Sequence, residues 1–216
     1  ELAYIVDHAE ARFAVVEDQE QVDKLLHLRA QCPKLEFIVY DDQRGLGVYS
    51  EPNLMSLEEL RERGRKFEQN QPAYVEDEIA KGGAADTAII CYTSGTTGTP
   101  QGAMLSYRNL IVTARNAAAV ESLTQDEEIL SYLPMAWVGD HVFSYAQSIV
   151  TGFAANCPES PATVLQDLKE IGPTYFFAPP RIWESILTNV LLRIEDCAWP
   201  KRRLSHFFLD LAQNME

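Results

Sequence analysis

The sequence is poor in basic residues relative to acidic ones. Its 18 lysines and arginines face 32 aspartates and glutamates, which gives a formal net charge of −14 at pH 7. A general nucleic-acid-binding protein needs lysine and arginine to neutralise phosphates, so this balance argues against one. The same acidity provides no electrostatic attraction to anionic lipid. A bound nucleotide would need local positive potential against this field, and Mg²⁺ is the ion we expect to supply it.

Cysteine, histidine and long apolar runs are also scarce. The four cysteines lie far apart and lack C-x-x-C spacing; they are Cys32, Cys91, Cys157 and Cys197. The four histidines are equally scattered, so we expect no zinc site and reduced, mostly buried cysteines in a cytosolic protein. No apolar run approaches the ~18 residues of a membrane span. No signal peptide is visible, but Glu1 opens an apparent helix, so we expect the native N-terminus to lie outside this sequence.

Short apolar strand candidates alternate with amphipathic helical stretches along the 216 residues. Strands are predicted at 12–16, 37–40, 88–92, 129–133, 153–156 and 174–178. Helices are predicted at 19–30, 57–69, 105–122, 138–150, 161–171, 181–196 and 199–216. This alternation is typical of βαβ units and predicts an α/β fold, with a mainly parallel sheet and flanking helices.

Local signals set the expected helix starts and the division of the chain. Ser56 and Glu59 predict a capping box, and Ser160 before Pro161 predicts a helix that starts with proline at its first position. Turn-forming residues are concentrated at 45–53 and 71–86. We therefore divide the chain into a first α/β portion at 1–71, a connection at 72–86 and a last portion at 87–216.

The most informative segment runs from Cys91 to Gly102 and reads CYTSGTTGTPQG. It follows the apolar run that starts at Ala88 and precedes the helical stretch that starts at Leu105. Glycines let the backbone approach an anion closely, hydroxyls donate hydrogen bonds, and the N–H groups of a helix start add favourable partial charge. The spacing of a Walker A loop is absent. We interpret the segment as a phosphate-binding loop, although a solvated linker has a similar composition.

This loop resembles the signature Y-T-S-G-T-T-G-x-P-K-G of the adenylate-forming superfamily, with Gln101 at the position of the usual lysine. The run Leu133-Pro134-Met135-Ala136 resembles the L-P-L-A-H-x-x-E motif of that superfamily. Pro180-Arg181-Ile182-Trp183-Glu184 is similar to the V-P-R-[VI]-[FW]-E-K element of its fatty-acyl branch, and residues 1–6, 15–19 and 200–207 also look like that branch. The resemblance implies part of the N-terminal AMP-binding domain of a long-chain fatty-acid acyl-CoA synthetase, without the small C-terminal domain.

The resemblance also implies an activity and a set of site residues. The parent would be an AMP-forming ligase that activates a fatty acid with ATP and Mg²⁺ and transfers it to coenzyme A. The implied metal-holding residue is Thr93. The implied nucleotide-binding residues are Thr93, Ser94, Gly95, Thr96, Thr97, Gly98, Gln101 and Gly102. The implied substrate-pocket residues are Trp137, Val138, Asp140 and His141.

Two departures from the family pattern leave alternatives open. Gln101 can donate hydrogen bonds but brings no charge, and Trp137 stands where the family has a histidine. Trp137 could line a pocket or be a core tryptophan, and His141 fits an ordinary helix-face histidine better than a catalytic one. Another adenylating enzyme, for aryl or amino acids, remains an alternative. So does a nucleotide-binding module without catalysis.

Several segments of the superfamily have no match in this sequence. We find no Y-G-x-T-E segment, no T-G-D segment and no C-terminal domain with an adenylating lysine. We therefore expect no catalytic residue here and no ligase activity from this chain alone. The expected partners are the fatty acid, ATP and coenzyme A, without nucleic acid or a transmembrane segment. A cytoplasmic location is expected, and peripheral membrane contact and a homodimer remain open.

Overall fold

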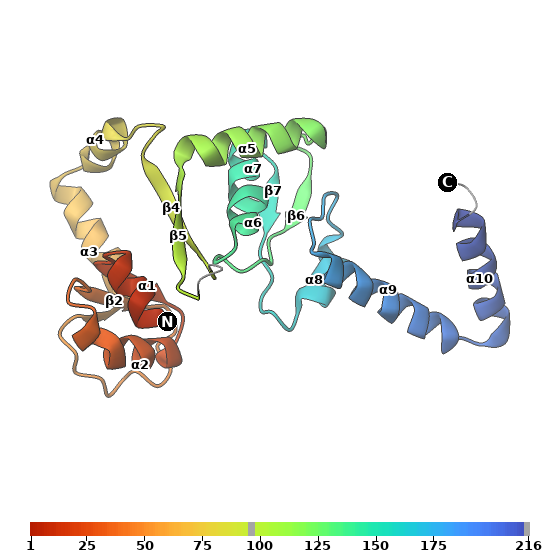
Figure 1. Ribbon diagram of the computed structural model, residues 1–216, viewed down its shortest axis with the longest axis horizontal. Helices are drawn as coiled ribbons and strands as arrows, with labels where there is room; N and C mark the ends of the chain where they lie inside the picture. Colours follow the sequence, from red (N-terminus) through yellow and green to blue (C-terminus); the bar gives the residue numbers. More distant parts are fainter. Residues whose placement is uncertain (95–97, 214–216) are drawn as a thin grey trace. The chain divides into compact units, whose positions relative to one another are not determined.

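The structure is a computed structural model that describes residues 1–94 and 98–213 (Figure 1). The chain divides into two compact units. The first contains Glu1–Thr124 and Leu133–Gly152, and the second contains Gln125–Tyr132 and Phe153–Glu216. Each unit has its own strand pairing and its own helices, so the two are described in turn.

The first unit begins with a three-stranded parallel sheet. Its elements are α1 (Leu2–His8), β1 (Phe13–Val16), α2 (Gln19–Leu28), a 3-10 turn (Arg29–Gln31), β2 (Phe37–Tyr40) and β3 (Leu54–Ser56). β2 is the central strand, with Phe13 paired to Phe37 and Ile38 paired to Leu54. The buried side chains of this sheet and of α2 form one core; they are Val22, Leu25, Cys32, Leu35, Ile38 and Leu46. The predicted strands at 12–16 and 37–40 are confirmed, whereas β3 was not predicted.

Two exposed helices follow this sheet, α3 (Leu57–Asn70) and α4 (Tyr74–Lys81). Half of the predicted capping box is present, because the Ser56 hydroxyl accepts a hydrogen bond from the Glu59 N–H. The Glu59 carboxylate instead accepts a hydrogen bond from Arg63 at 2.7 Å, one turn further on. α4 lies within the segment that we predicted as a connection. Its first turn carries Glu76 and Asp77, which favour a helix start.

An antiparallel hairpin comes next, formed by β4 (Thr87–Thr93) and β5 (Gln101–Ser106). β4 pairs only with β5 among the described residues, so its predicted place in a parallel sheet is wrong. The predicted helix start at Leu105 is also wrong, because α5 (Tyr107–Val120) begins after a capping box between Ser106 and Asn109. The Ser106 cap ends β5, and the six residues of β5 are enough to pair along β4.

Helix α5 packs against a second helical stretch and forms a second core with it. That stretch consists of α6 (Val138–Asp140), a π-helical turn (His141–Ala146) and α7 (Gln147–Thr151). The core is formed by Leu110 and Ala114 of α5 with Val142 and Ala146 of the π-helical turn. The single helix predicted at 138–150 is therefore interrupted by a turn with one extra residue.

The second unit has a short parallel pair, β6 (Glu128–Leu130) and β7 (Ala154–Asn156), followed by three helices. The helices are α8 (Val164–Ile171), α9 (Pro180–Glu195) and α10 (Trp199–Gln213). α8 begins after Thr163, so the helix start predicted at Ser160-Pro161 is wrong; the Ser160 N–H instead donates to the Thr163 hydroxyl. The strand predicted at 174–178 is also wrong. In the described part of the chain, the N–H groups of Thr174 and Tyr175 both donate to the Glu128 carbonyl, and the Glu128 N–H donates to the Thr174 hydroxyl. The segment thus meets β6 at Glu128 and forms no ladder.

The α/β class, with mainly parallel pairing and flanking helices, is confirmed. All four cysteines are free, but the prediction that most are buried is wrong: Cys32 is buried, whereas Cys157 and Cys197 are exposed in connections after β7 and α9. Among the described residues, no helix combines the length and the apolar character needed to cross a bilayer.

Replacing Ile38 by alanine tests the first core. Ile38 is 2 % exposed at the centre of the parallel sheet, so Ile38→Ala should lower the free energy of unfolding by about 2–5 kcal/mol. Ile79→Ala on α4 is the matched control, because Ile79 is 72 % exposed and should change that free energy by less than about 1 kcal/mol. Urea unfolding of both variants measures the difference. Equal effects would contradict the assignment of this core.

Replacing Gly102 by alanine tests the hairpin register. A Cβ at Gly102 would lie 2.8 Å from Cγ2 of Ile90 and 3.2 Å from Cζ of Tyr92, whose hydroxyl is hydrogen-bonded to His8. Gly102→Ala should therefore lower the free energy of unfolding by about 1–3 kcal/mol. Gly47→Ala is the control, because a Cβ there has no neighbour within 4 Å. If the two variants unfold alike, β4 and β5 do not pair in this register.

Candidate functional site

The base of the candidate phosphate loop is a pair of residues on opposite strands. Thr93, the last residue of β4, is the cross-strand partner of Gln101, the first residue of β5. Directly opposed residues of an antiparallel pair point to the same side of the sheet. The Thr93 hydroxyl and the Gln101 amide therefore lie on one face of the hairpin, and both residues are exposed.

The described part of the loop fits a phosphate in three respects. The side chains of Thr93, Ser94 and Thr99 are exposed, and their hydroxyls have no hydrogen-bond partner in the part of the chain that the structure describes. Gly98 has a φ of 84°, in the left-handed region that favours glycine, and a Cβ there would meet nothing within 4 Å. Open backbone and free hydroxyls are what an anion site needs. Gly95, Thr96 and Thr97 lie outside the described residues.

The two faces of the hairpin have different neighbours. Ile89 and Leu105, on the face that carries Thr93 and Gln101, pack against the core formed by α5 and the π-helical turn. Tyr92, on the opposite face, donates to or accepts from Nδ1 of His8 in α1 at 2.7 Å. The helical stretch that contains the predicted pocket residues therefore packs on the same face of the hairpin that carries Thr93 and Gln101.

The π-helical turn brings two polar pairs to the beginning of that stretch. The Ser144 hydroxyl donates to the Asp140 carboxylate at 2.9 Å, and His141 Nδ1 lies 2.9 Å from the Tyr145 hydroxyl. Asp140 and His141 are 7 % and 8 % exposed, so both are buried. The partner of His141 is thus a residue four positions further on in the same helical stretch.

Tyr145, the partner of His141, is the titratable group of this turn whose pKa is shifted. Burial raises the pKa of the Tyr145 phenol, and the nearby Asp140, Cys91 and Tyr107 raise that pKa further. Of these three, Cys91 lies on β4, two residues before Thr93. Sequence analysis did not identify Tyr145 or Ser144. Their spacing of four from His141 and Asp140 was the available signal.

The two remaining predicted pocket residues precede the turn and are open to solvent. Trp137 is 53 % exposed and Val138 is 48 % exposed. The Trp137 side chain is thus more than half exposed in this structure. Its carbonyl accepts the Asp140 N–H at 3.1 Å, which ties it to the buried start of the helix.

Gln147 is a further polar residue that sequence analysis missed. It is fully buried at the start of α7, and neither its amide nitrogen nor its amide oxygen has a hydrogen-bond partner in the described part of the chain. An unpaired buried amide costs about 1–3 kcal/mol. A leucine would fill the same space without that cost, so packing alone does not explain the choice of glutamine.

Among the described residues, no group of three histidine, cysteine or acidic side chains could bind a metal ion. A Mg²⁺ ion requires fewer protein ligands, because it keeps several waters and takes oxygens from the phosphates it accompanies. The exposed Thr93 hydroxyl at the loop base is compatible with that role.

Comparison with known proteins identifies the family of the chain. The AMP-binding enzyme family matches residues 1–208. The long-chain-fatty-acid–CoA ligase ACSBG1 of Rattus norvegicus is 30% identical over 202 residues, covering 87% of this chain and 26% of the relative. The long-chain-fatty-acid–CoA ligase ACSBG2 of Homo sapiens is 31% identical over 188 residues, covering 85% of this chain and 27% of the relative. The chain thus spans about a quarter of the length of these curated relatives.

Solved structures support the fold. The adenylation domain of a carboxylate reductase from Mycobacterium chelonae aligns with a TM-score of 0.70 at 16% identity, covering 91% of this chain and 32% of that one. The anthranilate CoA ligase AuaEII, solved with anthranoyl-AMP, aligns with a TM-score of 0.60 at 21% identity, covering 82% and 32%. With the family match over nearly all of the sequence, these likenesses lead to one conclusion: the chain belongs to the AMP-binding enzyme family.

Proposed function

We propose that the protein carrying this chain is an ATP-dependent, AMP-forming long-chain fatty acid–CoA ligase. In that reaction a fatty-acid carboxylate displaces pyrophosphate from the α-phosphorus of ATP, and the thiol of coenzyme A then displaces AMP. The observation that carries the proposal is the pairing of Thr93 with Gln101 at the base of a loop of hydroxyls and glycines. The helical stretch that starts at Val138 packs on the hairpin face that carries this pair.

The proposed reaction brings an anion to a polyanion, so it depends on charge neutralisation and alignment more than on proton transfer. In this proposal the hydroxyls of Thr93 and Ser94, together with the backbone around Gly98, hold the β- and γ-phosphates. Gly95, Thr96, Thr97 and Gly102 complete that set by position in the motif. Mg²⁺, held at Thr93, would supply positive charge that Gln101 cannot supply.

The fatty-acid specificity is the finer part of the proposal. The names of the ACSBG relatives support it, since both are long-chain-fatty-acid–CoA ligases. Trp137 and Val138 would border the acyl pocket, and the buried Asp140 and His141 would fix the start of the helix behind it. On this proposal, residues 1–216 are part of the N-terminal AMP-binding domain. A panel of fatty, aryl and amino acids in the pyrophosphate-release assay distinguishes the substrate classes.

One observation favours a second candidate, a nucleotide-binding module without catalysis. Gln101 leaves the base of the loop without a cation, and the chain as a whole carries a net charge of −14. Such a protein would retain ATP but release no pyrophosphate with any carboxylate. The two candidates therefore differ in turnover, and binding alone does not separate them.

One test of the proposed function concerns the charge at the loop base. Gln101→Lys in the full protein should improve the use of ATP by about tenfold or less, because an exposed charge contact is worth up to about 1 kcal/mol. The measurement is pyrophosphate release with a fatty acid over a range of ATP concentrations. Gln71→Lys, at the exposed end of α3, adds the same charge outside the loop and should have no effect. A native protein without activity that gains it only with the lysine would favour the non-catalytic module.

Another test concerns the hydroxyl at position 93. Thr93→Ala should reduce kcat/KM for ATP by about tenfold or more, since it removes the oxygen proposed for Mg²⁺ and phosphate. Thr93→Ser keeps that oxygen and should retain most of the activity. Thr87→Ala, at the other end of β4, is the control for loss of a threonine from the same strand. Full activity of Thr93→Ala would remove Thr93 from the site.

A further inference from the structure

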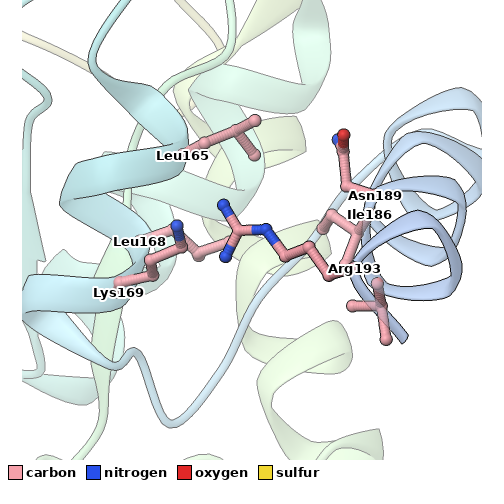
Figure 2. A pocket seen from close by; sticks show the side chains of 7 residues that line it. Leu165, Leu168, Lys169, Ile186, Asn189 and Arg193 are labelled. Carbon is pink, nitrogen blue, oxygen red and sulfur yellow. The ribbon is translucent and has the colours of Figure 1, made fainter. Parts of the chain in front are cut away.

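A hollow of about 260 Å³ lies between α8 and α9 in the second unit. Its wall is largely apolar and comes from both helices, with Leu165 and Leu168 on α8 and Ile186 and Val190 on α9. Leu165 and Val190 are 45 % and 46 % exposed, so the hollow opens to solvent. We call it the α8–α9 groove (Figure 2).

Two cations border this groove, one on each helix. Figure 2 shows the Arg193 side chain extending from α9 toward Leu168 and Lys169 on α8. Neither Lys169 nor Arg193 has a carboxylate within ion-pair distance in the described part of the chain. Lys169 and Arg193 both line the groove, in a chain with 32 acidic and 18 basic residues. An anion in the groove would be attracted by both cations.

The apolar surface continues beyond the groove. A neighbouring hollow of about 270 Å³ shares Leu165 and Leu168 as part of its wall and adds Phe176 and Ile182. The two cations thus border the α8–α9 groove, and the apolar surface extends from it across Leu165 and Leu168 into the neighbouring hollow. A ligand that matches this surface has a charged end and an apolar chain.

We propose that the α8–α9 groove binds a single-chain anionic amphiphile, with its phosphate or carboxylate head at Lys169 and Arg193 and its alkyl chain over Leu165, Leu168 and Val190. Charge complementarity selects this occupant over a neutral lipid, and the apolar wall selects it over a free inorganic anion. The proposal goes beyond the ligase function. The groove shares no residue with the phosphate loop, and its occupation requires no ATP.

The test measures binding of dodecyl phosphate to the full protein by calorimetry, without ATP and below the micelle-forming concentration. Dodecyl phosphate should bind, whereas inorganic phosphate and dodecanol, which each carry half of its chemistry, should bind at least about tenfold more weakly. The double variant Lys169→Gln/Arg193→Gln should lose about tenfold in affinity. The matched control Arg108→Gln/Arg115→Gln removes two exposed arginines of α5 that have no ion pair among the described residues, and this variant should bind as the native protein does.

A second variant addresses the apolar half of the groove. Val190→Asn should weaken binding of dodecyl phosphate and leave the melting temperature nearly unchanged, because Val190 is half-exposed. Unchanged binding in both Lys169→Gln/Arg193→Gln and Val190→Asn would overturn the proposal.

Other occupants give other results, each of which contradicts the proposal. If another segment of the protein fills the groove, dodecyl phosphate will not bind and the double variant will lower the melting temperature. If a second copy fills it, dodecyl phosphate will not bind and the double variant will dissociate the oligomer. If a membrane surface is the occupant, anionic phospholipid vesicles will bind with this variant dependence but monomeric dodecyl phosphate will not. Pyrophosphate release, assayed on the same samples, reports separately on the ligase proposal.

Discussion

The register of the β4–β5 hairpin is the constraint on which the candidate site depends. Because Thr93 faces Gln101, the two ends of the loop are fixed opposite each other, with both side chains on one face. That face also carries Ile89 and Leu105, which pack against the core of α5 and the π-helical turn. A shift of one residue in β5 would move Leu105 out of this core. It would also carry Gln101 to the opposite face of the hairpin, where Tyr92 contacts α1. The same apolar contacts that stabilise the hairpin therefore orient the polar groups at its end.

The helical stretch behind the hairpin combines an apolar core with an unusual set of buried polar groups. Asp140 is paired with Ser144 and His141 with Tyr145, so these groups satisfy one another across single turns. The turn that holds them is π-helical, a geometry that occurs often at functional sites. Gln147, one turn later, is buried, and its side-chain amide has no such partner among the residues that the structure describes. A sequence selected for stability alone would place apolar residues at these positions, so we interpret the stretch as shaped by the site beside it.

Sequence analysis predicted the α/β class, most strands and the position of the loop, but it missed how the loop is mounted. Periodicity identified Ala88–Tyr92 as a strand, yet it could not show that residues 101–106 return along it, because Gly102 and Ala103 interrupt the apolar alternation. The π-helical turn reads as ordinary helix in the sequence, since one extra residue per turn leaves no compositional signal. Conversely, the helix start predicted at Ser160-Pro161 moved to Val164 because Thr163 bonds back to Ser160. In this last case a side-chain pair formed on folding decided where the helix begins.

The account of the site is tested most directly by a crystal structure of the full protein with Mg²⁺ and a non-hydrolysable ATP analogue. It predicts phosphate oxygens within about 2.7–3.2 Å of the Ser94 hydroxyl and the backbone N–H groups around Gly98, with the Thr93 hydroxyl at the metal. It also predicts that the Gln101 side chain faces the phosphates from the opposite strand. Phosphates bound away from the hairpin, with Thr93 and Gln101 both facing solvent, would contradict it.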